Sequence, residues 1–175
     1  MTERVSERRR EAEPEETTYD RLMRVQNEAV RQRAEGKVVI RGKEKKWQQS
    51  RQALSKRYCS QFDWDTLAAP GWNIFIQTIK KHSGRHTHQG GLAIFVLEGS
   101  GYSEVDGERY DWKKGDLIVL PVKPGGCEHQ HFNADPEKPA VWMAWRFWPF
   151  SEVVDMNKTQ QSEHPDWAGA KPKTV

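Results

Sequence analysis

Short apolar runs separated by glycine-containing turns fill the chain from Trp72 to Phe150. Each run has the length of a strand and is rich in β-branched or aromatic residues, and the runs read WNIFIQTI, AIFVLEG, KKGDLIVLPV and VWMAWRFWPF. The turns between them are marked by Gly99-Ser100-Gly101, Asp106-Gly107 and Lys114-Gly115-Asp116. Short strands at regular spacing are typical of a sandwich or a closed barrel. We therefore expect an all-β barrel over residues 63–150.

Charge is divided unevenly between the two parts of the chain. The first 60 residues hold 16 Lys and Arg against 10 Asp and Glu, a net charge of +6, whereas residues 61–175 carry −3. Hydrophobic residues make up only 35% of the 175 residues. The apolar residues of the core therefore have to come from the second part of the chain.

The segments outside the barrel have different textures. Residues 1–16 are charged and lack aromatic residues, which predicts a disordered N-terminus. Residues 17–62 predict an N-terminal helix and then a basic extension, with a short strand at 38–40 and another near 57–62. Residues 151–175 are polar again, and we expect a C-terminal tail.

Two absences suggest where the protein works. The N-terminal stretch MTERVSERRREAEPEE has no apolar segment of the kind found in signal peptides, and no window approaches the roughly 20 apolar residues of a membrane helix. The two cysteines, Cys59 and Cys127, are too few for a disulfide framework. We expect a soluble, cytoplasmic protein with no membrane partner.

Histidines concentrate in one part of the predicted barrel. Five of the six lie between positions 82 and 131. Residues two apart on a strand share a face, so His86 pairs with His88 and His129 with His131. If the two strands are neighbours, three neutral imidazoles converge inside the barrel. Such a group is a site for Fe, Zn, Ni, Cu or Mn.

The arrangement of these residues resembles the cupin family. His86, His88 and Gly99 fit its first motif, and Leu92 stands where that motif has a glutamate. Its second motif is matched by Gly115, Pro121, Pro124, Gly126, His129 and Asn133, with three extra residues between its two halves. The resemblance implies a double-stranded β-helix, or jelly-roll, barrel that binds a metal inside. It also implies that the protein pairs as a homodimer.

Within that family, a first motif that lacks this glutamate resembles that of the ring-cleaving gentisate and salicylate 1,2-dioxygenases. The resemblance implies Fe(II) held by His86, His88 and His129, with O₂ as co-substrate and His131 as a neighbouring active-site residue. Local geometry alone also permits His131 as the third ligand. Those relatives carry two cupin domains, and the motifs occur once here, so their substrates are not carried over.

Charge counting gives a physical meaning to Leu92. A divalent metal with three neutral histidines keeps a charge of about +2, because no carboxylate offsets it, and a low-dielectric barrel strengthens its attraction for an anion. A substrate with two adjacent oxygens, such as a hydroxybenzoate, a catechol-like ring or a β-dicarbonyl, would balance that charge. A Zn, Ni or Mn site would satisfy the same count.

Four other residues are candidates for the reaction. His131 is suited to general acid–base work, the alternatives being a supporting role or a fourth metal ligand. Arg146 could meet a substrate carboxylate while Trp145 packs on a ring. Alternation places these two residues on opposite faces of their strand, and the sequence leaves open which face points inward. Gln77 is a candidate cavity residue on the preceding strand.

Three other function classes compete with a dioxygenase. The barrel could bind a ligand or a metal without catalysis, or it could be a Zn- or Mn-dependent isomerase or lyase acting on a small oxo-acid. The basic stretch from Lys43 to Arg57, interleaved with Trp47 and Tyr58, could contact nucleic acid. Only one convincing helix precedes the barrel, however, which disfavours a helix-turn-helix regulator.

Overall fold

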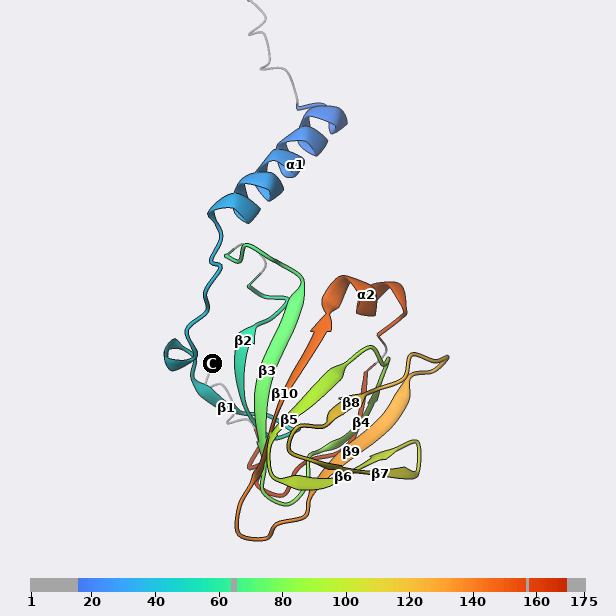
Figure 1. Ribbon diagram of the computed structural model, residues 1–175. Helices are drawn as coiled ribbons and strands as arrows, with labels where there is room; N and C mark the ends of the chain where they lie inside the picture. Colours follow the sequence, from blue (N-terminus) through green and yellow to red (C-terminus); the bar gives the residue numbers. More distant parts are fainter. Residues whose placement is uncertain (1–15, 64–65, 157, 170–175) are drawn as a thin grey trace, which may run out of the picture.

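The computed structural model describes residues 16–63, 66–156 and 158–169. Two antiparallel sheets face each other and enclose a barrel (Figure 1). The first sheet has the order β1 (Trp47–Gln49), β2 (Leu54–Cys59), β3 (Trp72–Ile79), β10 (Ala140–Phe147), β5 (Ala93–Glu98) and β8 (Leu117–Val119). The second has the order β11 (Thr159–Ser162), β4 (Arg85–His88), β9 (Cys127–Asn133), β6 (Ser100–Val105) and β7 (Glu108–Lys113). The expectation of an all-β barrel is confirmed.

Alternating burial positions the side chains of both sheets. In β10 every second residue from Ala140 to Arg146 is buried, and the others are half-buried or exposed. This strand pairs along its whole length with β3 and over most of its length with β5. The main apolar cluster lies between the sheets and contains Ile79, Ile94, Leu120, Trp142 and Ala144. It fills part of the barrel and leaves the rest open.

The hairpin between β6 and β7 shows how closely sequence can determine a turn. Asp106 and Gly107 both have positive φ, 53° and 86°. A two-residue hairpin of this kind needs that conformation at both positions, and Asp-Gly is one of its preferred sequences. The Asp-Gly turn expected from the sequence is therefore confirmed.

The N-terminal helix expected within residues 17–62 forms as α1 (Thr18–Glu35). The Thr17 hydroxyl accepts a hydrogen bond from the backbone N–H of Asp20, whose carboxylate accepts one from the backbone N–H of Thr17. No residue of α1 is buried, and the helix projects away from the barrel (Figure 1). The prediction of disorder over residues 1–16 falls almost entirely outside the described residues.

The strand expected at residues 38–40 does not form. Val38 and Val39 are 84% and 65% exposed, and the neighbouring Lys37 makes only an isolated bridge to Leu67. An apolar β-branched run becomes a strand only where a partner strand lies beside it. Here a short 3₁₀ turn, η1 (Gly42–Glu44), and β1 follow instead, while the second expected strand lies three residues earlier, as β2.

The C-terminal segment is more ordered than its polarity suggests. A short helix, α2 (Trp148–Val153), follows β10, and β11 then pairs with β4. In that pairing Gln160 lies opposite His86. The sheets therefore extend at both ends beyond residues 63–150. Within the described part of the chain, no helix has the length and apolar character needed to cross a bilayer.

Candidate metal centre

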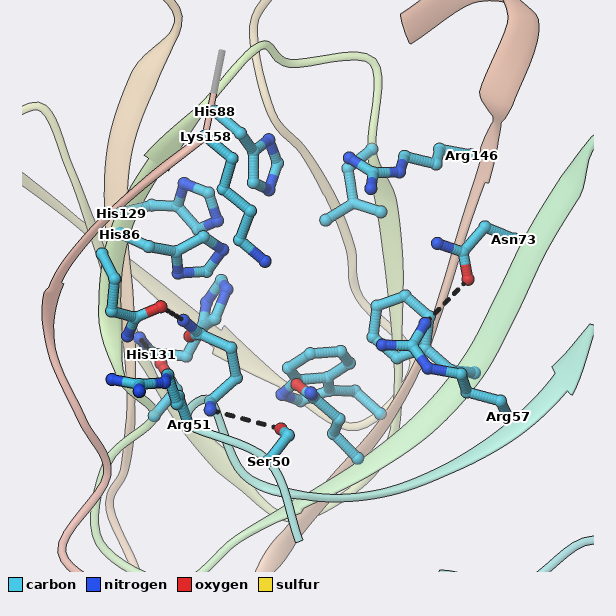
Figure 2. A pocket seen from close by; sticks show the side chains of 17 residues that line it. Ser50, Arg51, Arg57, Asn73, His86, His88, His129, His131, Arg146 and Lys158 are labelled. Atoms are coloured by element: carbon cyan, nitrogen blue, oxygen red, sulfur yellow. Dashed lines mark hydrogen bonds between the residues drawn. The ribbon is translucent and has the colours of Figure 1, made fainter. Parts of the chain in front are cut away.

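The pairing of β4 with β9 brings the histidines together. In this register His86 lies opposite His129, and His88 lies opposite Cys127. All three imidazoles are buried and point into the barrel (Figure 2). Their ring centroids are 4.3 to 5.0 Å apart, and one nitrogen from each ring lies within 4.8 Å of the others. The convergence expected from the two His-x-His pairs is confirmed.

The ring nitrogens of these three histidines have lone pairs available to a metal. Nδ1 of His88 lies 2.6 Å from the carbonyl oxygen of Gln89, and Nδ1 of His129 lies 3.2 Å from that of Cys127. A carbonyl only accepts, so both Nδ1 atoms carry the proton and both Nε2 atoms keep a free lone pair. Nε2 of His129 and Nδ1 of His86 are buried without a hydrogen-bond partner. These orphaned atoms fit a metal ion.

Burial also keeps the rings in the neutral form that binds metals. It lowers the pKa of His88 to about 3 and that of His129 to about 4, and it lowers the pKa of His86 further. Neighbouring histidines add to the effect at His86 and His88, because two positive rings at this separation repel each other. At neutral pH all three rings are therefore uncharged.

His131 lies beside this group and has other partners. Its ring centroid is 5.5 Å from that of His129, and its Nδ1 lies 2.7 Å from the Ser103 hydroxyl oxygen. That oxygen also accepts the indole N–H of Trp112, at 3.0 Å. The Ser103 proton can then be donated to Nδ1 of His131, and in that tautomer the His131 proton lies on Nε2. Of the two histidines left open by the sequence, the structure groups His129 with His86 and His88.

The cavity beside the histidines has a volume of about 490 Å³. Leu92 lines it and is 5% exposed. Among the described residues that line it, none is an aspartate or a glutamate. Gln77, Trp142 and Arg146 also line it, whereas Trp145 lies on the other face of β10 and does not. Trp142, edge-on to His131 at 5.4 Å between centroids, is thus the tryptophan of this strand that meets the cavity.

Four cationic side chains line the same cavity, and one of them, Arg51, is paired with Glu163. The other three are called the cationic group below: Arg57, Arg146 and Lys158. Arg57 and Arg146 come from β2 and β10 and lie across from the histidines, whereas Lys158 enters from the histidine side (Figure 2). Burial and the nearby Arg57 lower the pKa of Arg146 to about 10. Burial and both arginines lower the pKa of Lys158. Arg146 therefore remains a cation at neutral pH, as an arginine side chain in a protein ordinarily does.

Sequence reasoning missed Arg57 and Lys158 as cavity residues. Both lie outside the motifs, and only the pairing of β2 and β11 with the barrel strands brings them to the site. Arg85, between the two ligand positions on β4, points away as alternation predicts. It binds Glu104 at 2.6 Å and Glu128 at 2.9 Å on the outer surface of the sheet.

Comparisons with known proteins agree with this geometry. Residues 75–146 match the family described as the cupin domain. A gentisate 1,2-dioxygenase from a Ralstonia species is 37% identical over 59 residues, which cover 33% of this chain and 16% of that enzyme. An acireductone dioxygenase from Phaeosphaeria nodorum is 33% identical over 70 residues, covering 37% of this chain and 38% of that enzyme. Each match spans less than half of the relative.

A solved structure extends the likeness beyond the matched segment. The nucleoside dehydratase Pac13 of Streptomyces has a TM-score of 0.53 and covers 73% of this chain and 93% of its own, at 12% identity. At that identity the likeness shows the fold alone. The fold, the family match and the three clustered histidines therefore agree on the kind of barrel, and the chemistry has to be argued from the cavity.

Proposed function

Residues 75–146 are a cupin domain, and from the three histidines inside its barrel we propose that the protein is a non-haem Fe(II) dioxygenase cleaving a small chelating aromatic or dicarbonyl compound. The observation that carries the proposal is the donor set. Three neutral imidazoles converge, two of their nitrogens are orphaned, and none of the described residues lining the cavity is acidic. The short matches to two dioxygenases support the same reaction class.

His86, His88 and His129 would hold the metal. Bound Fe(II) would supply the redox chemistry with O₂ and offer open positions to a chelating substrate. Because Leu92 stands in place of a carboxylate, the charge of such a site is left for an anionic substrate to balance. Zn, Ni and Mn fit the same three ligands.

The remaining residues would position the substrate. With its proton on Nε2 and Nδ1 tied to Ser103, His131 can donate a hydrogen bond to a substrate oxygen and exchange a proton there. Trp142 gives a flat apolar surface beside it. Gln77 and Arg146 offer hydrogen-bond donors from the opposite wall. The outward position of Trp145 leaves it no such role.

The test is oxygen uptake by protein reconstituted anaerobically with Fe(II). The substrates are gentisate, salicylate, hydroquinone, catechol and a β-diketone. We expect uptake with one class, its loss in His86→Ala together with the bound iron, and its retention in His82→Gln, which alters a histidine outside the cavity. Iron bound one per chain without uptake of oxygen would overturn the dioxygenase and favour a non-oxidative isomerase or lyase, or a binding protein.

A further inference from the structure

The cationic group brings positive charges that the proposed metal centre does not require. Arg146 is 9% exposed, whereas Arg57 is exposed, and both lie on the wall across from the histidines (Figure 2). Lys158 exposes more than a third of its surface, yet its ammonium reaches the middle of the cavity (Figure 2). The three cations therefore share one cavity with a site that would itself be positive.

Carboxylates do not neutralise these cations. Among the described residues, none of the three forms an ion pair, whereas Arg51 at the rim of the same cavity is paired with Glu163. Arg57 donates to the amide oxygen of Asn73 at 3.0 Å, and Nε of Arg146 is buried with no partner. Burying unpaired charge is unfavourable, so such groups are usually matched by a counter-charge. Arg146 is the buried cation of the three, and an anionic ligand in the cavity would supply its counter-charge.

Aromatic rings hold the two guanidinium groups in place. Arg57 stacks over Phe75 at 5.2 Å and Arg146 over Trp148 at 4.9 Å, measured from the guanidinium carbon to the ring centroid. A guanidinium held in one orientation presents fixed N–H donors suited to the oxygens of a carboxylate or phosphate. Asn73 restrains Arg57 further.

We propose that Arg57, Arg146 and Lys158 form a second subsite for an anion, so that the ligand carries an acidic group remote from the oxygens that would meet the metal. Three cations exceed the charge of one carboxylate, so the group is a phosphate or a pair of carboxylates. The chelating end of this ligand rests on the proposed function, whereas the anion subsite needs no metal. Substrates with one acidic group, such as salicylate, would leave the cationic group unmatched.

The test is anion binding to the metal-free, full-length protein by isothermal titration, with tryptophan fluorescence as a second readout. The probes are phenyl phosphate, isophthalate and benzoate. We expect one site per chain and at least tenfold weaker binding of benzoate than of the better dianion. Whichever dianion binds more tightly identifies the group as phosphate or paired carboxylates.

Single-residue variants test which side chains bind the anion. Arg146→Gln, Arg57→Gln and Lys158→Gln should each weaken the better probe at least tenfold, whereas Arg109→Gln, an exposed arginine paired with Asp111, should not. Lys158→Gln lies near the surface and tests the subsite even if a buried variant fails to fold. His86→Ala should keep anion binding while it loses metal, which separates this proposal from the dioxygenase. Equal affinities across folded variants, or no binding of any probe, would overturn the subsite.

Discussion

Ser103 is the residue whose substitution should have the clearest effect on the candidate site. Its hydroxyl is fully buried between Trp112 and His131. Ser103→Ala leaves both ring nitrogens without that partner, and each buried unpaired group costs about 1–3 kcal/mol. We expect a lower Tm and, because the His131 tautomer is released, a pH–rate profile displaced from that of the wild type.

The control for Ser103 lies on the same strand. Ser100→Ala removes an exposed hydroxyl that makes no side-chain hydrogen bond to the described residues, so neither the Tm nor the pH profile should move. Thermal melts followed by circular dichroism and initial rates from pH 5 to 9 measure both. A Ser103→Ala variant with the wild-type pH profile would reduce Ser103 to a structural residue.

Leu92 tests the charge argument at a single position. Leu92→Glu places a carboxylate on a cavity wall that has none among its described residues. We expect the KM for an anionic substrate to rise about tenfold. The added carboxylate would repel the anionic ligand, and it would also offset part of the charge of the bound metal. Leu92→Gln adds a similar side chain without the charge and should leave KM close to that of the wild type. Equal KM values for the two variants would contradict this reading.

The sequence predicted the histidine cluster well because its geometry is local. The two His-x-His pairs and the period of two residues place His86 with His88, and His129 with His131, on shared faces before any tertiary structure is known. The cationic group was only partly predictable. Arg146 lies on a patterned strand, but Arg57 and Lys158 come from segments whose register with β3 and β4 depends on the whole barrel.

At the scale of elements, α1 has a strong local signature and no buried residue, although Gln32 donates a hydrogen bond to the carbonyl oxygen of Leu67 at 3.4 Å. Leu22, Val25 and Val30 are 60%, 50% and 56% exposed. If the barrel does not need the helix, deleting residues 1–35 should shift the Tm by no more than about 2 °C, as expected when no buried residue is removed. Thermal melts and analytical ultracentrifugation of both forms measure the effect. A larger fall with a change in mass would show that α1 holds two copies together.

β11 shows where pattern reading fails. Its sequence, TQQS, has no apolar residue. A strand is normally recognised by the alternation of apolar and polar residues, and that pattern is missing here. The strand forms because β4 offers an open edge and side-chain amides hold it there, with Gln161 donating to the Thr87 hydroxyl at 2.7 Å and Gln52 donating to Gln160 at 2.7 Å. The opposite case is residues 38–40, where the apolar pattern is present and the neighbouring strand is not.

At the scale of the whole molecule, the buried histidines make stability depend on pH. The pKa values of His86, His88, His129 and His131 are lowered, chiefly by burial, whereas the unfolded chain binds these protons near pH 6.5. A lowered folded pKa contributes stability above the unfolded value, and that stability is lost as the pH falls toward the folded one. The metal-free protein should therefore lose stability steadily below about pH 6.5, by about 1.4 kcal/mol per pH unit for each histidine.

The stability lost through four such histidines together approaches the total stability of an ordinary domain, which is about 5–15 kcal/mol. We therefore expect the metal-free barrel to unfold between about pH 6 and pH 4, because the unfolded chain takes up as many as four more protons than the folded one. Denaturant melts from pH 8 to pH 4 measure this slope. His131→Asn should reduce it by about one proton. Stability that is constant from pH 7 to pH 5 would mean that the rings are protonated in the folded barrel, and the neutral donor set would then have to be abandoned.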